Sequence, residues 1–282
     1  MAGLLSGLAS LGLEHLEGVD IFGPSEEERK AADAMAAAGL EASFLYDRTF
    51  ECPVCGNKFT SKTVKTGKAK LLGTDMDLRP VYEGIDMRKY DVPLCGLCAY
   101  AALNQYFGGV SAAQAKRVKD HISQNVTLKK YGGETYTYEE ALERYKLALA
   151  CAVVKGTRAS EKAYICLKSA WLVRGSYESL DETAPDSPQK LAALKEQEDE
   201  YLKSAYEGFV EARKKEPFPM CGMDTDTVDY LIAVLAARFK KFDVAGRLLG
   251  AIITAPEANK RIKDRARDLK NAILEELKKE KR

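Results

Sequence analysis

Two pairs of cysteines with the spacing of metal ligands are the residues in this sequence best suited to chemistry. Residues 52–55 read Cys-Pro-Val-Cys, and residues 95–98 read Cys-Gly-Leu-Cys. Two residues between the thiols let both sulfurs of a pair converge on one ion while backbone amides of the turn donate to them. Two such pairs complete a tetrahedral shell, with zinc–sulfur bonds of about 2.3 Å. The sequence therefore predicts a metal centre with four ligands: Cys52, Cys55, Cys95 and Cys98.

A shell closed by four thiolates leaves no position for water or substrate. We therefore expect the ion to stabilise the fold and not to activate a substrate. Zinc is the expected ion. The Cys-Pro-x-Cys-Gly pattern of residues 52–56 also resembles rubredoxin, in which iron occupies the same kind of site, so iron and a redox function are the alternative. The sequence around the second pair does not predict the aromatic-rich packing that this alternative calls for.

The segment between the two pairs is longer than the roughly 15–20 residues of ordinary zinc ribbons. Three of its lysines are interleaved with hydroxyl residues and are suited to phosphate contacts: Lys62, Lys65 and Lys68. Arg79 is suited to a bidentate contact with a carboxylate or a phosphate. The alternative is a solvated hairpin in which Arg79 pairs with a neighbouring acid: Asp75, Asp77 or Asp86. These four basic residues are the candidate ligand contacts.

Catalytic machinery is not predicted. His15 and His121 are the two histidines of the chain, which leaves few centres for a Ser-His-Asp or Cys-His arrangement. Cys151 and Cys166 fall among apolar residues at helical spacing and are expected in the core, whereas Cys221 lies in a predicted loop. We therefore expect no catalytic residue and no organic cofactor, and a protein that is not an enzyme.

The elements that must position the cysteines differ from the rest of the chain. Residues 45–108 consist of short runs broken by Gly, Pro and Thr, with the β-branched and aromatic residues typical of strands. A small zinc-ribbon-like or rubredoxin-like module is expected here. Residues 1–44 form an acidic segment, partly helical or flexible, with a capping-box pattern that favours a helix over about 25–38. Residues 109–282 have helical periodicity, and the predicted fold class is mostly α.

Start and stop signals divide residues 109–282 into successive helices. Starts are expected at four capping residues: Thr137, Ser160, Ser187 and Asp226. The first two helices should stop at Gly156 and near Gly175, and the third before Pro217. Residues 226–256 read as a helix pair of tetratricopeptide length, followed by a last helix from about Glu257. The pattern predicts a bundle or solenoid like that of tetratricopeptide repeats (TPR-like).

Composition and charge restrict the classes of partner. The 282 residues are 30% charged with a formal net charge of +1, so no strong attraction of the whole chain to nucleic acid or acidic membranes is expected. No apolar run reaches the roughly 20 residues of a membrane span, and residues 1–18 lack the positive start of a signal peptide. Seven cysteines, four of them in two pairs, fit metal ligation in a reducing compartment. We expect a cytoplasmic protein.

The segments around the cysteines also carry a resemblance to a known family. These segments are residues 50–55, 61–64, 77–80, 90–92 and 95–102. They resemble an uncharacterised bacterial family, common in Firmicutes and known only as a domain of unknown function with a zinc ribbon. The resemblance implies a TPR-like helical second half and no agreed activity. Members often carry Pro or His between the second pair of thiols, where this chain has Gly96 and Leu97.

Together these observations predict a cytoplasmic zinc-binding adaptor that binds a protein or peptide through a helical-repeat surface. Aromatic residues of the helices are candidates for that surface if they face outward: Tyr145, Trp171, Tyr177, Tyr201 and Tyr206. Burial in the core is the alternative for these side chains. Nucleic-acid binding through the basic insertion and a rubredoxin-like redox function are the two alternative functions.

Overall fold

The computed structural model describes residues 8–14, 35–36, 39–129, 131–180, 184 and 187–280. The chain divides into two compact units, residues 1–43 and 44–282. In the first unit, η1 (Leu8–Leu11) is a short 3-10 helix, and residues 39–43 are helical. The helix predicted over about 25–38 falls mainly outside the described residues, of which 35–36 are helical.

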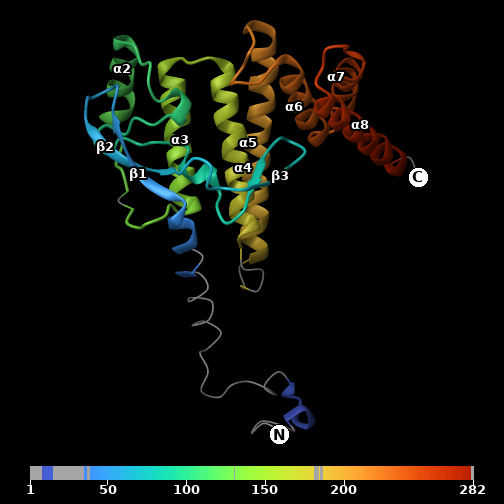
Figure 1. Cartoon of the computed structure of the whole chain (residues 1–282), viewed down its shortest axis with the longest axis horizontal. Coiled ribbons are helices and arrows are strands. Elements are labelled where there is room, and N and C mark those ends of the chain that lie inside the picture. The colour runs from blue at the N-terminus through green and yellow to red at the C-terminus, as the bar shows by residue number, and fades with distance from the viewer. Residues whose placement is uncertain are drawn as a thin grey trace. The chain divides into compact units, whose positions relative to one another are not determined.

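The second unit begins with two antiparallel hairpins (Figure 1). β1 (Leu45–Glu51) pairs with β2 (Lys58–Val64), and β3 (Leu71–Thr74) pairs with β4 (Pro80–Tyr82). The β1–β2 register places Phe50 opposite Phe59 on one face. Because aromatic residues directly across a ladder pack against each other, this pair fixes the end of the hairpin that carries the first two cysteines.

The chain then turns helical, as predicted. Two 3-10 turns, η3 (Met87–Tyr90) and η4 (Asn104–Tyr106), flank the second cysteine pair. The helices that follow are α2 (Ala112–Val118), which continues into the π-helical turn η5 (Lys119–Ser123), α3 (Tyr138–Lys155), α4 (Ala159–Glu178), α5 (Ser187–Lys215), α6 (Thr225–Arg238), α7 (Phe242–Thr254) and α8 (Lys260–Glu280). Among the described helices, none is both long enough and apolar enough to cross a membrane.

The predicted helix starts and ends are correct for some helices and wrong for others. The Thr137 side chain caps α3, and Gly156 ends it with φ of 68°. The cap of α6 is Asp224, two residues before the predicted Asp226. Gly175 does not stop α4, which continues to Glu178. A Cβ at Gly175 would lie 2.6 Å from the Asp86 carboxylate, so this glycine is required for close packing of α4 and not for a turn.

The largest core lies between α4, α5, α6, α7 and α8. A Cβ on Gly208 of α5 would lie 2.8 Å from the Cβ of Ala163 on α4, so the two helices approach closely at this point. Tyr145, Trp171 and Tyr206 are buried, at 0%, 5% and 7% exposure. These three aromatic residues therefore do not form an outward surface. They belong to the core, which was the alternative expectation for them.

A buried carboxylate, Asp77, joins the β3–β4 hairpin to α4. It accepts hydrogen bonds from Trp171 Nε1 at 3.0 Å and from Arg174 at 2.7 Å. Arg174 also contacts Glu198 of α5. Burial by itself lowers the pKa of Arg174, but the carboxylates of Asp77 and Glu198 more than offset this, and the net shift is upward. The hairpin is thus held by a network of charges that satisfy one another.

The Asp77→Ala variant should lose roughly 3 kcal/mol of unfolding free energy, because it leaves the buried Arg174 charge and the Trp171 N–H without this acceptor. Urea denaturation measures the loss. Asp47→Ala is the control, since it removes an ion pair with Lys62 whose acid is 58% exposed, and its cost should stay below about 1 kcal/mol. Equal stability of the two variants would contradict the role given to Asp77.

Candidate metal centre

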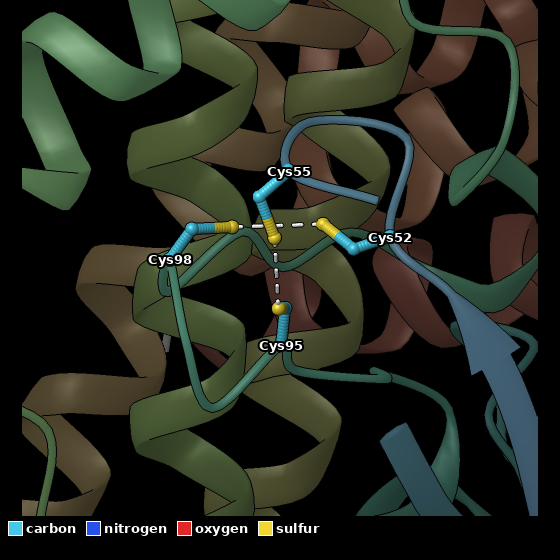
Figure 2. Close-up of side chains that lie close together, drawn as sticks. All are labelled: Cys52, Cys55, Cys95 and Cys98. Atoms are coloured by element: carbon cyan, nitrogen blue, oxygen red, sulfur yellow. Dashed lines mark hydrogen bonds between the residues drawn. The ribbon is translucent and has the colours of Figure 1, made fainter. Parts of the chain in front are cut away.

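The four predicted cysteines converge on one point (Figure 2). Their sulfur atoms all lie within 4.8 Å of one another. Two contacts join one pair to the other: Cys52 to Cys98 at 3.5 Å, and Cys55 to Cys95 at 3.6 Å. A tetrahedral shell with metal–sulfur bonds of about 2.3 Å has sulfur–sulfur edges of about 3.8 Å. The thiols are therefore spaced as ligands of a single ion.

The first cysteine pair forms the loop of the β1–β2 hairpin. The Gly56 N–H donates to the Cys52 carbonyl at 2.8 Å, and the Cys52 N–H donates to the Asn57 carbonyl at 2.9 Å. Gly56 has φ of 73°, in the left-handed region that glycine adopts without strain. This conformation turns the chain back after Cys55, so both sulfurs point to the same side.

The second pair repeats this construction with different residues. The Ala99 N–H donates to the Cys95 carbonyl, and the Cys95 N–H donates to the Tyr100 carbonyl, both at 2.9 Å. Ala99 occupies the position that Gly56 has in the first pair and has φ of 57°, although it is not a glycine. The spacing of the cysteines predicted a turn here, but not the left-handed conformation of Ala99, because the glycine signal is absent at that position.

Hydrogen bonding within the cluster favours the charged form of Cys52 and the neutral form of Cys98. The hydrogen bond with Cys98 lowers the pKa of Cys52 to about 5, against the effect of burial and with help from the N–H groups of Val54 and Cys55. The same contact raises the pKa of Cys98. Burial raises the pKa of Cys55, which the N–H of Asn57 opposes. An ion would displace the remaining protons, so metal binding must weaken as pH falls.

The centre is packed against helices and aromatic rings. Phe50 and Phe107 lie 5.4 Å apart and Tyr100 and Phe107 lie 5.1 Å apart, measured between ring centroids. Val118 of α2 and Cys151 of α3 belong to the same buried cluster as the ligands. Tyr100 and Phe107 follow the second cysteine pair, so the expectation that aromatic packing is lacking there was wrong. That argument against iron therefore no longer holds.

Further contacts around the cysteines were not predicted from sequence. The side-chain amide of Asn57 lies 3.9 Å from the Cys95 sulfur, and the Ser123 hydroxyl donates to the Cys98 carbonyl at 2.7 Å. For Asn57, its position two residues after Cys55 was the one sequence signal that could have indicated this contact. Ser123 comes from η5, and nothing in the sequence links it to the cysteines.

The basic residues proposed as ligand contacts have different surroundings. Arg79 donates to both carboxylate oxygens of Glu178 at 2.7 Å and to Asp75 at 2.5 Å, and its side chain is 6% exposed. The alternative interpretation, in which Arg79 pairs with a neighbouring acid, is confirmed for Asp75. Lys62 pairs with Asp47 at 3.1 Å. Lys68 is exposed in the turn after β2, and Lys65 is half-buried.

The remaining cysteines do not belong to the group of four converging thiols. Cys151 and Cys166 are buried, as predicted. Cys221 is half-buried in a loop, where its thiol donates to the Ser160 carbonyl at 3.3 Å. Burial raises the pKa of the Cys221 thiol. This environment favours the neutral thiol at neutral pH, and the thiol is therefore a weak nucleophile.

The fold and the cysteine cluster define a helical protein with a four-cysteine module. The family model described as "Uncharacterized protein conserved in bacteria (DUF2225)" matches residues 45–273, and the chain belongs to this family. The match begins at β1 and ends within α8, so it includes both the cysteines and the helices. No curated protein and no solved structure matches the chain.

The purified protein should contain one zinc ion per chain, and Cys52→Ser or Cys98→Ser should lose it. Loss should unfold the module, because metal-binding energy of about 10 kcal/mol is folding energy in small sites of this kind. Elemental analysis and circular dichroism measure the two effects. Cys221→Ser is the control and should keep its metal. Stoichiometric zinc in a Cys52→Ser, Cys95→Ser double variant would show that other residues bind the ion.

Proposed function

We propose that this chain is a cytoplasmic zinc-binding adaptor that binds a protein or peptide through its helical surface. The observation that supports the structural role of the metal is the closed geometry of the thiols. All four sulfurs face one another, and Cys52, Cys95 and Cys98 are buried at 1%, 0% and 6% exposure. An ion held by four thiolates in this position has no coordination site for a substrate. The proposed ion is therefore structural.

The arrangement of the helices supports a repeat-like surface. Consecutive helices pack on each other: α3 on α4, α4 on α5, α6 on α7 and α7 on α8. Such stacking of neighbours is how solenoid proteins form extended binding surfaces. We therefore propose a TPR-like stack from α3 to α8, with the cysteine module packed against α2 and α3 at its start.

An apolar groove offers a place for the partner. A cavity of about 340 Å³ lies between α6 and α8, beside the β3–β4 turn. Val234 and Ala237 line it from α6, Ala272 and Ile273 line it from α8, and Met76 lines it from the turn. Met76 is 49% exposed, which leaves apolar surface at the edge of the groove. A peptide with apolar side chains would bury this surface.

Nucleic-acid binding and a rubredoxin-like redox function, the two alternatives, each require a feature that can be checked. Phosphate binding needs free cations, whereas Lys62 pairs with Asp47 and Lys70 pairs with Glu83 within the chain. This supports the peptide over nucleic acid. Iron in the same four-sulfur site would absorb visible light, whereas zinc is colourless. We expect the protein purified in air to be colourless, and a red protein with an equivalent of iron would establish the redox alternative.

A matched pair of substitutions on α8 tests the groove. Ala272 is exposed and lines it, whereas Asn271 is also exposed and does not line it. The unaltered chain and the Asn271→Arg variant, each immobilised on a column, should retain the same protein from a bacterial lysate. The Ala272→Arg variant should not retain it, because the added side chain fills the groove. Mass spectrometry of the three eluates makes the comparison.

The salt dependence of retention distinguishes a protein or peptide partner from a nucleic acid. Retention through an apolar groove should persist between about 0.05 M and about 0.5 M salt, whereas binding through phosphate contacts falls steeply over that range. Identical eluates from the two α8 variants, or retention that vanishes with salt and nuclease, would overturn the adaptor proposal.

A further inference from the structure

A second and larger cavity lies where the cysteine module meets the helices. Its volume is about 470 Å³, within the roughly 300–1,000 Å³ typical of small-molecule sites. One wall comes from β2, the β3–β4 hairpin and η3, which all belong to the segment between the two cysteine pairs. The other wall comes from α4 and α6. It shares no lining residue with the groove between α6 and α8.

Most of the lining is apolar, with four aromatic side chains. These are Tyr82, Tyr90, Tyr164 and Trp171. Leu78 and Met223 add aliphatic surface between them. Aromatic walls favour a flat ring system, because stacking on such rings contributes about 1–3 kcal/mol per base in nucleic-acid sites and is offered by every planar heterocycle.

The polar groups of the cavity balance in charge. Lys168 pairs with Asp91 and lies over the Tyr164 ring, with its Nζ 4.7 Å from the centroid. The other lining cation, Arg88, pairs with Asp86 at 2.8 Å. A charged ligand would leave one of these groups without compensation, which is costly in a partly buried site. A ligand without net charge fits the lining better.

The Asp91–Lys168 pair still offers hydrogen bonds to a ligand. A carboxylate has about four lone-pair positions, and an ammonium group has three donors. Among the described residues, the Asp91 carboxylate accepts a side-chain hydrogen bond from Lys168. A ring with an N–H group beside a carbonyl on one edge would match both groups at once: the N–H would donate to the Asp91 carboxylate, and the carbonyl would accept from the Lys168 ammonium group. Hypoxanthine and guanine carry that edge, and adenine does not.

We propose that this cavity binds a flat, uncharged nitrogen heterocycle of the guanine or hypoxanthine type, as the free base or the nucleoside. The ring N–H donates to Asp91, the adjacent carbonyl accepts from Lys168, and the ring lies against the aromatic walls. Asn104 at the same cavity offers a further amide to the ligand. Because one wall belongs to the segment between the cysteine pairs, the site is complete only when that segment is in place.

Trp171 makes the site directly observable. It is the one tryptophan of the chain and it lines the cavity. Zinc-loaded full-length protein should show a saturable change in tryptophan fluorescence with inosine and with guanosine. 1-Methylinosine keeps the ring, the carbonyl and the neutral charge but lacks the N–H. It should bind at least about tenfold more weakly, because the Asp91 carboxylate loses its donor.

Substitutions test the same contacts from the side of the protein. Lys168→Met should weaken inosine binding about tenfold or more, whereas Lys162→Met, the same change on α4 outside the cavity, should leave binding unchanged. The comparison of inosine with 1-methylinosine uses the unaltered chain, so it tests the proposed site even if Lys168→Met does not fold. The proposal is overturned by no saturable change up to about 1 mM inosine, by equal affinity for 1-methylinosine, or by tighter binding of the anion benzoate.

Discussion

The convergence of four thiols from two distant turns is the constraint on which the rest of the module depends. Cys55 and Cys95 are separated by 40 positions, yet their sulfurs lie 3.6 Å apart. Closing a loop of this length has an entropic cost, which the contacts at its ends must offset. The loop contains β2, β3, β4 and η3. In the proposed function, the metal supplies the energy that holds these elements in place.

The second attachment of this loop is electrostatic. Asp77 contacts Trp171 and Arg174, and Arg79 contacts Glu178, so the hairpin is fixed to α4 by charges that neutralise one another. The loop, α4 and α6 together line the larger cavity. The same geometry that keeps residues 44–282 in one compact unit thus creates the cavity that we propose as a binding site.

Sequence reasoning succeeded where the signal was local. Each cysteine pair, the mostly helical fold, the Thr137 cap and the Gly156 stop follow from residues within a few positions of one another, and the predicted cluster joins two such pairs. It failed where partners are distant in the chain. Gly175 was taken as a stop because its neighbour in space, Asp86, could not be identified, and Asp77 was considered as a partner of Arg79 and not of Trp171 and Arg174. The proposed division at residues 108 and 109 stays a prediction.

Amide hydrogen exchange with and without a metal chelator tests most directly whether the metal holds the module. The account predicts that removing the ion abolishes protection in β1 and β2 and in the segment between the cysteine pairs, that α6 and α7 keep theirs, and that added zinc restores the original pattern. Unchanged protection of β1 and β2 in fully metal-free protein would contradict it, because the thiols would then hold the loop without an ion.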